Sequence, residues 1–195
     1  SLEGKSHDIL ATERLLLNIL SHLSGISTHT NKIVRIAKKV NPNVEILATR
    51  KTLPGLRDIE KRAVVHGGGA THRMRLDDAI LIKDNHLKLS KNIKKSIEIS
   101  RSKYPNLMVE VEADNEQQAI EIAKNGADRV MLDNFSPDEA TATIRKLREI
   151  SDIEIEISGG VTIENIASYA KKADFISLGS LTMSSLPVDF SLHVL

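Results

Sequence analysis

Cations and acids gather at several points where a short apolar or glycine-rich run of this 195-residue sequence ends. The cations are Arg50, Lys51, Arg73 and Lys83, with His72 beside them, and the acids are Glu112 and Asp133. Several cations in one cleft suit a substrate with several negative charges, because charge-assisted hydrogen bonds to carboxylates and phosphates are strong. A pair of acids in the same cleft suits Mg²⁺, which prefers hard oxygen ligands, or a ribose diol.

Two small turns add a phosphate-binding signal. Ser158-Gly159-Gly160 follows an apolar run and precedes a predicted helix, and Gly179-Ser180 follows another such run. Backbone N–H groups at a turn before a helix can bind a phosphate. Together with the charged residues, these turns predict a site for a phosphorylated sugar and an anionic partner.

The apolar runs that carry these residues are predicted strands, and amphipathic segments between them are predicted helices. The landmark residues recur roughly every 20 to 30 positions, which is typical of repeated strand–helix units. Such repeats predict an α/β fold, either a β/α barrel or a doubly wound sheet of parallel strands. In both folds the active site lies at the C-terminal ends of the strands. No strand is followed by a G-x-G-x-x-G sequence, so a dinucleotide site is disfavoured.

The expected strands are Val44–Ala48, Ile80–Lys83, Val109–Glu112, Arg129–Leu132, Ile153–Ile157 and Phe175–Leu178, with Asp189–Leu195 as a candidate last strand. The expected helices cover residues 8–26, 28–39, 56–65, 91–102, 115–125 and 136–150, and another begins near Thr162. We expect Ser24-Gly25 to bend the chain between the first two helices.

Three features have two interpretations each. Gly67–Gly69 is either a flexible loop or a close approach of backbone to a ligand. Glu110 shares a strand face with Glu112, so it lies either on a wet sheet edge or in an interior where it needs a cationic partner. Arg14 follows Glu13 in an amphipathic segment, and the pattern alone favours a solvated ion pair.

Composition narrows the class of protein. One domain of ordinary hydrophobicity is expected at this length. The chain has no cysteine, no tryptophan and only 3% aromatic residues, which excludes disulfides and disfavours stacking of bases. A formal net charge of +1 argues against a nucleic-acid surface, and no apolar stretch approaches the length of a membrane span. We expect a cytoplasmic protein without nucleic-acid or membrane partners.

Six ordered motifs resemble those of the quinolinate phosphoribosyltransferase family, from about Gly4 to the C-terminus. They are Ala48–Arg57, Gly67–Arg73, Leu81–His86, Val109–Glu112, Met131–Asn134 and Ser158–Gly160. The resemblance implies an open, incomplete β/α barrel occupying residues 1–195. It also implies conversion of quinolinate and phosphoribosyl pyrophosphate, with Mg²⁺, to nicotinate mononucleotide, pyrophosphate and CO₂ in NAD biosynthesis, by a homodimer or a dimer-based oligomer.

Residue roles follow from the same resemblance. Arg50, His72, Arg73 and Lys83 match residues that hold the quinolinate carboxylates, and Arg14 matches an arginine lent by the other subunit. Lys51 and Lys83 match the pyrophosphate side of the site. Glu112 and Asp133 match acids near the ribose and the metal, in direct contact or through water. The resemblance thus implies a catalytic set of Lys51, Lys83, Glu112 and Asp133, and a 5′-phosphate site of Ser158, Gly159, Gly160, Gly179 and Ser180.

The sequence departs from the family pattern in two ways. It begins about where the family's barrel does, so a preceding domain of the family is expected to be absent. Ser180 stands where the family often has alanine. The alternatives are a nicotinate phosphoribosyltransferase-like enzyme, a molybdenum-transport-associated paralogue, or a non-catalytic phosphate-binding barrel. The cluster of Arg50, His72, Arg73 and Lys83 favours a dicarboxylate over nicotinate.

Overall fold

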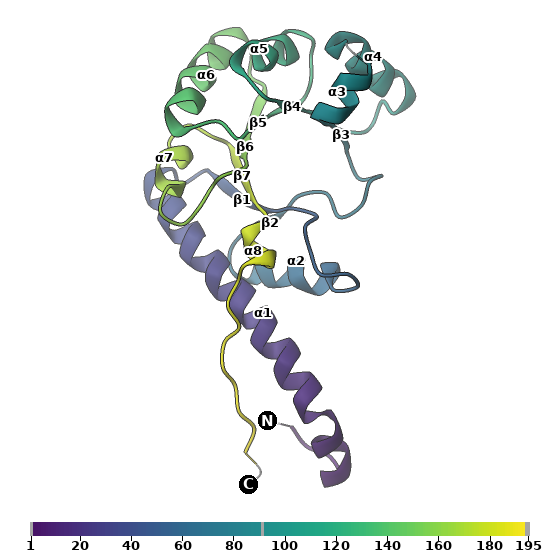
Figure 1. Ribbon diagram of the computed structural model, residues 1–195, viewed down its shortest axis with the longest axis vertical. Coiled ribbons are helices and arrows are strands. Elements are labelled where there is room, and N and C mark those ends of the chain that lie inside the picture. Colours follow the sequence, from purple (N-terminus) through teal and green to yellow (C-terminus); the bar gives the residue numbers. More distant parts are fainter. Residues whose placement is uncertain (1, 91, 194–195) are drawn as a thin grey trace.

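A computed structural model, which describes residues 2–90 and 92–193, contains a seven-stranded parallel sheet in the order β2-β1-β7-β6-β5-β4-β3. The strands form an arc rather than a closed ring (Figure 1), and the two outermost strands, β2 and β3, do not pair in the described part of the chain. The strands are β1 Glu45–Ala48, β2 Ala70–Thr71, β3 Ile80–Ile82, β4 Val109–Ala113, β5 Arg129–Asp133, β6 Glu154–Ser158 and β7 Phe175–Leu178. This open half-barrel confirms the predicted α/β fold.

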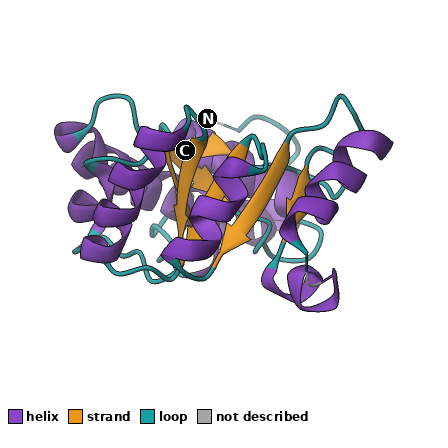
Figure 2. Cartoon of the chain, turned by 90° about the horizontal axis from the view of Figure 1, so that it is seen from above, coloured by secondary structure: helices purple, strands orange, loops and turns teal. Residues whose placement is uncertain are grey.

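Helices cover the outer side of the arc. The helices are α1 Ser6–Val40, α2 Arg57–His66, α3 Asp84–Ser90, α4 Ile93–Lys103, α5 Glu116–Lys124, α6 Pro137–Ile150, α7 Ile166–Ala170 and α8 Ser180–Met183. Figure 1 shows α1, α5, α6 and α7 along the convex side of the sheet, and Figure 2 shows the strands at the centre with helices around them. None of the described helices combines the length and apolar character that crossing a membrane requires.

Alternation along the strands separates an apolar outer face from a polar inner face. The outward residues are buried and aliphatic and include Val109, Val111, Val130, Leu132, Ile155, Ile157 and Ile176. The register pairs Glu110 with Arg129 and Arg129 with Glu154, so these charges share the inner face. The wet-edge interpretation of Glu110 is therefore wrong, because Glu110 is fully buried in a parallel sheet.

The N-terminal segment differs from its prediction. One helix, α1, runs without a break through Ser24 and Gly25. Gly25 serves packing instead, since a Cβ atom there would lie 2.2 Å from the carbonyl oxygen of Leu186. The C-terminal segment crosses the helix at this point, where Val188 donates its N–H to the Ser21 carbonyl. Glycine thus permits backbone-to-helix contact rather than a bend.

The glycine run follows neither predicted interpretation. A Cβ atom on Gly67 would lie 2.5 Å from the carbonyl oxygen of Ser27, so the close approach is to α1 and not to a ligand. Gly68 has φ +90, which other residues rarely adopt. The glycine run fixes the turn from α2 into β2. The sequence did not indicate this two-residue strand.

Smaller differences concern element ends. The helix expected near Thr162 begins at Ile166, and α3 was not expected. Residues 189–193 form no strand, and 194–195 lie outside the described residues. The helix from Ser136 is confirmed: the Ser136 side chain and Glu139 form a capping box, and Pro137 occupies the first turn.

The contact at Gly25 predicts that a glycine-to-alanine substitution inside a helix lowers the free energy of unfolding instead of raising it. Replacing glycine by alanine inside a helix normally stabilises a protein by roughly 0.5–1 kcal/mol. We expect Gly25→Ala to destabilise by about 1–3 kcal/mol, because the new methyl group must displace the Leu186 backbone. Urea unfolding would measure the change, with the exposed Thr28→Ala in the same helix as the control. A stabilised Gly25→Ala variant would show that the C-terminal segment does not pack there.

Candidate active site

A cavity of about 460 Å³ opens at the C-terminal ends of the strands and brings together most of the predicted site residues. Among its lining residues are Arg50, Lys51, His72, Arg73, Lys83, Glu112, Asp133, Ser158 and Gly159. They come from the ends of β1, β2, β3, β4, β5 and β6. The parallel sheet therefore joins residues that lie more than a hundred positions apart in the sequence.

Four predicted residues do not line this cavity. Gly160 directly follows Gly159, and Gly179 and Ser180 lie at the end of β7. The N-terminal half of α1, which carries Arg14, extends away from the sheet (Figure 1). Arg14 is exposed and forms no ion pair within the described residues, so the predicted pair with Glu13 is not found.

Lys83, Glu112 and Asp133 form one charged group at the rim. The Lys83 ammonium donates to Glu112 at 2.8 Å. Burial raises the pKa of Asp133, and the negative charge of nearby Glu112 raises it further, although Lys83 opposes this. Two acids that repel one another favour an added cation, so their donor set fits Mg²⁺.

Asn134 and Gly159 fit closely together beside these acids. Asn134 donates from its side chain to Asp133 at 2.7 Å and has a left-handed backbone, φ 56. A Cβ atom on Gly159 would lie 2.2 Å from the Asn134 side-chain oxygen, and Gly159 itself has φ +80. The close approach of Asn134 and the positive φ therefore explain why position 159 is a glycine. The predicted phosphate site did not reveal this packing role.

Lys51 has a similar dependence on a glycine. A Cβ atom on Gly179 would lie 2.9 Å from Cδ of Lys51, and the Thr182 hydroxyl donates to the Lys51 carbonyl. Gly179 therefore lets the lysine stem cross the end of β7 toward the cavity.

A buried ionic cluster lies on the inner face of the sheet, beside the cavity. His72 Nε2 is 2.9 Å from Glu110 and 3.3 Å from Glu156, although neither contact is aligned well enough for a hydrogen bond. Arg129 pairs with Glu154 at 2.7 Å and Glu156 at 3.3 Å, and its guanidinium lies 3.7 Å from the centre of the Phe175 ring. Glu110 therefore lies in the interior beside His72, as the second interpretation of this residue expected.

The cluster binds a proton more tightly than its isolated side chains would. Burial lowers the pKa of His72, but Glu110 and Glu156 outweigh it and raise the pKa to about 9. Burial likewise raises the pKa of Glu110. However, His72 Nδ1 accepts the N–H of Arg73 at 2.9 Å, which requires an unprotonated Nδ1. We therefore assign the extra proton to the Glu110 side of the cluster, where it leaves this contact intact.

Both ring nitrogens of His72 thus face protein groups, and the residue orders its neighbours as well as lining the cavity. His72, Glu110 and Glu156 could also hold a metal, since their ligand atoms lie within 4.8 Å of one another. Arg129 already pairs with Glu156, and His72 Nδ1 already accepts the Arg73 N–H, whereas Asp133 has no ion pair within the described residues. This cluster is therefore a poorer cation site than Glu112 and Asp133.

Three buried residues that support the cavity carried no recognised signal. Lys61 and Glu60 lie on α2 and are almost completely buried, and Glu156 lies on β6. Because side chains alternate along a strand, Glu156 shares a face with Ser158. This alternation is the sequence signal that could have identified Glu156 as a residue of the inner face. Burial of Glu60 and Lys61 has no signature in a helix pattern.

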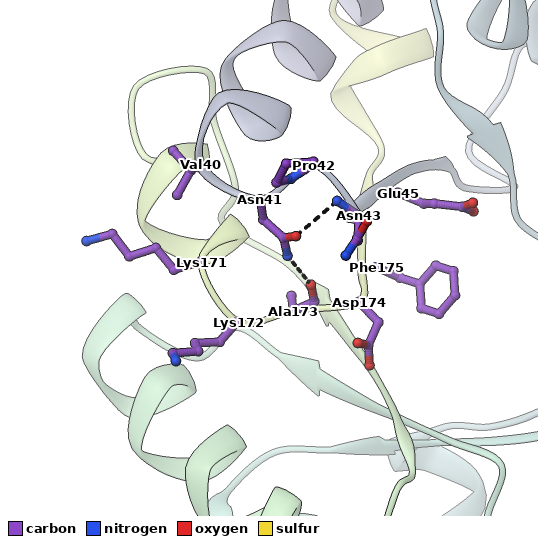
Figure 3. A pocket seen from close by; sticks show the side chains of 10 residues that line it. All are labelled: Val40, Asn41, Pro42, Asn43, Glu45, Lys171, Lys172, Ala173, Asp174 and Phe175. Atoms are coloured by element: carbon purple, nitrogen blue, oxygen red, sulfur yellow. Dashed lines mark hydrogen bonds between the residues drawn. The ribbon is translucent and has the colours of Figure 1, made fainter.

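A second pocket, at the N-terminal ends of β1 and β7, holds no comparable set of groups (Figure 3). Figure 3 shows the hydrogen bond that the Asn41 side chain donates to the Ala173 carbonyl, at 3.1 Å. The same amide also donates to the Ala170 carbonyl at 3.0 Å. This pocket results from the packing of the end of α1 against the loop before β7.

Comparisons with known proteins converge on one family. The family described as quinolinate phosphoribosyl transferase, C-terminal domain, matches residues 26–193. An Archaeoglobus fulgidus protein described as "Probable nicotinate-nucleotide pyrophosphorylase (carboxylating)" is 46% identical over the whole chain, which covers 76% of that relative. The human protein described as "Nicotinate-nucleotide pyrophosphorylase (carboxylating)" is 37% identical over 99% of this chain and 66% of its own length.

Solved structures agree. NadC from Streptococcus pyogenes superposes with a TM-score of 0.89 at 39% identity, covering 96% of this chain and 65% of that one. The chain thus spans about two thirds of the human relative and of this structure, and about three quarters of the archaeal relative.

The buried cluster predicts a pH-dependent stability defect. Arg129→Met would leave Glu156 buried without its cation, and breaking a buried pair costs about 3–5 kcal/mol. In the intact protein the pKa of Glu156 is lowered: burial opposes this, but the nearby Nε2–H group of His72 and the charge of Arg129 prevail. Its stabilisation is then present above its unfolded pKa and is lost as the pH falls through its folded pKa.

In Arg129→Met the pKa of Glu156 should instead rise, so its destabilisation is relieved as the pH falls. We expect the difference in free energy of unfolding between the two proteins to be larger at pH 7.5 than at pH 5, measured by urea titration. The exposed Arg145→Met serves as the control. A difference independent of pH would contradict the charge pairing.

Proposed function

Because the chain belongs to the quinolinate phosphoribosyltransferase family, we propose that it converts quinolinate and phosphoribosyl pyrophosphate to nicotinate mononucleotide, pyrophosphate and CO₂. This makes the chain a decarboxylating pentosyltransferase of NAD biosynthesis. The observation that carries the proposal is the cavity itself, where cations from several strand ends face two acids. A cytoplasmic location stays a prediction from the cysteine-free sequence.

Arg50, Arg73 and Lys83 supply the charge that a pyridine dicarboxylate needs. Nε of Arg50 is buried and has no hydrogen-bond partner in the described part of the chain. Burial, and after it the neighbouring charge of Arg50, lowers the pKa of Arg73, which indicates crowded cations. Bound carboxylates would relieve this repulsion and satisfy the free donor. His72 lines the same cavity and supports this site through Arg73.

Lys51 and the small turns provide the phosphate side of the site. Lys51 and Ser158–Gly159 line the same cavity as the carboxylate-binding cations, with Gly160, Gly179 and Ser180 next to them. Lys51 is suited to the departing pyrophosphate, and the turns are suited to the 5′-phosphate through their backbone N–H groups.

Glu112 and Asp133 complete the catalytic set with Lys51 and Lys83. Their crowded negative charges would hold Mg²⁺, directly or through water, and Mg²⁺ supplies charge neutralisation on the pyrophosphate. The same acids lie where they can stabilise positive charge that develops on the ribose.

The reaction needs positioning and electrostatic stabilisation more than a nucleophilic side chain. The pyridine nitrogen attacks C1 of the ribose as the bond to pyrophosphate breaks. The C2–carboxylate bond then breaks, CO₂ departs, and the electron pair left on C2 is stabilised by the adjacent positive ring nitrogen. A proton from water then bonds to C2 and gives nicotinate mononucleotide. No general base is obligatory, because the ring nitrogen carries no proton to remove and the one proton transfer required is from water to C2.

A second copy of the chain completes the site in this proposal. The N-terminal half of α1 exposes large apolar side chains, which favours burial against another surface. These residues are Leu10, Leu15, Leu16, Ile19 and Leu20. Arg14 lies among them, so an interface on this helix would carry Arg14 to a neighbouring subunit's cavity.

Substrate choice is the direct test of the activity. We expect CO₂ and nicotinate mononucleotide to form from quinolinate, phosphoribosyl pyrophosphate and Mg²⁺, with no turnover of nicotinate. Lys83→Ala should lower kcat by at least about 100-fold while the protein stays folded, because Lys83 is half-exposed at the rim. Turnover of nicotinate alone would refute the substrate assignment, and full activity of Lys83→Ala would refute the role of Lys83.

Mixing two inactive variants tests the shared site. Arg14→Ala and Lys83→Ala should each be inactive alone. An equimolar mixture should recover up to roughly a quarter of the normal activity per chain, because about half of the dimers are then mixed and each mixed dimer has one intact site. Sedimentation would confirm the dimers, and Lys39→Ala in place of Arg14→Ala is the control. Confirmed mixed dimers without recovery would show that Arg14 does not act across the interface.

A further inference from the structure

Lys61 is a buried cation that the mechanism above does not use. Only 1% of the residue is exposed. Its ammonium donates to the carbonyl oxygens of His72 at 2.9 Å and Arg73 at 2.7 Å. In the described part of the chain no carboxylate lies within ion-pair distance of it. The helix α2 thus holds the main chain of two cavity residues through one charged group.

Arg57, one helical turn earlier, holds the neighbouring segment in the same way. Its guanidinium donates to the carbonyls of Arg50 and Met74, both at 3.4 Å, and to the Thr52 hydroxyl at 3.2 Å. Two cations on one face of α2 therefore fix the segments that follow β1 and β2. Both use carbonyl acceptors, so neither loses its charge to an acid.

The surroundings of Lys61 make its charge costly. The charged groups that act on it are Arg57, Arg50 and Arg73, which repel it, and Asp78, which attracts it. Burial, and after it repulsion from Arg57, lowers the pKa of Lys61 to about 8. An apolar side chain of similar size would avoid this cost. The burial of Lys61 beside three arginines is explained if a bound anion adds negative charge next to them.

We propose that Lys61 is a positioning residue for the pyridine dicarboxylate: its contacts with the His72 and Arg73 carbonyls aim these residues into the cavity, and its buried charge strengthens the attraction of the substrate carboxylates. This inference rests on the proposed function. Lys61 does not line the cavity and touches no substrate, so it acts through the residues that it holds.

Binding of a dianion should then be linked to protonation. Negative charge placed near Lys61 favours its ammonium form, so the complex holds a proton that part of the free protein lacks. At pH 8 about half of the free protein lacks this proton, so up to roughly half a proton should be taken up per site. The His72 cluster titrates at about 9 and contributes less at this pH.

The decisive experiment uses the full chain and quinolinate itself. Calorimetric titration at pH 8 in two buffers with different heats of ionisation measures proton uptake on binding. We expect uptake by the unmodified protein and, in Lys61→Met, only the smaller contribution of the His72 cluster. We also expect Lys61→Met to raise KM for quinolinate about 10- to 100-fold, with KM for phosphoribosyl pyrophosphate changed less than about threefold. Lys61→Arg, which keeps the charge, should recover most of the quinolinate affinity, and Lys39→Met is the matched control.

The pH profile provides an independent readout. For the unmodified protein, kcat/KM for quinolinate should fall as the pH rises through about 8, and this limb should be missing in Lys61→Met. Absence of proton uptake by the unmodified protein would overturn the inference even if Lys61→Met fails to fold. Unchanged KM for quinolinate in a folded Lys61→Met would also overturn it. A failure of the unmodified protein to turn over quinolinate would instead overturn the proposed function.

Discussion

The paired charge of Arg129 at the centre of the concave face is the interaction on which the inner layer of the sheet depends. Its guanidinium contacts Glu154 and Glu156, and Glu156 in turn faces His72 together with Glu110. A half-barrel whose outer face packs against helices can expose only this inner face to a ligand. The free-energy cost of burying acids on this face is offset by the charge of Arg129 and by one extra proton. The inner face is therefore a polar surface beside the cavity.

Next to this polar surface, α2 holds the segments that carry the cavity cations without placing an acid beside those cations. Arg57 and Lys61 of α2 donate to carbonyls of the segments carrying Arg50, His72 and Arg73. Within the described residues, Lys83 is the cavity cation that pairs with an acid, Glu112. The remaining positive charge needs an external partner with several negative charges. Quinolinate and phosphoribosyl pyrophosphate together meet that need.

The positions of the described strands other than β2 could be predicted from the sequence, because each of these strands is a short apolar run with a charged or small residue at its end. The same rule predicts Lys83, Glu112 and Asp133 at one edge of the sheet, where the structure places them. It could not locate Lys61, whose burial depends on the path of the segment after β2, nor explain Gly25, whose neighbour lies 161 positions later at Leu186. Roles that depend on packing between distant segments leave no periodic signal in the sequence. Arg14 shows the same limit, because its proposed partner lies on another chain.

We propose that the cavity at the C-terminal strand ends binds a pyridine dicarboxylate beside a phosphoribosyl group. A crystal structure of the chain with quinolinate and an unreactive analogue of phosphoribosyl pyrophosphate would locate both ligands. We expect the quinolinate carboxylates to lie against Arg50, Arg73 and Lys83, with the ribose beside Glu112 and Asp133. Quinolinate bound elsewhere, for example in the pocket around Asn41, or a ring turned with its carboxylates toward the acids, would contradict it.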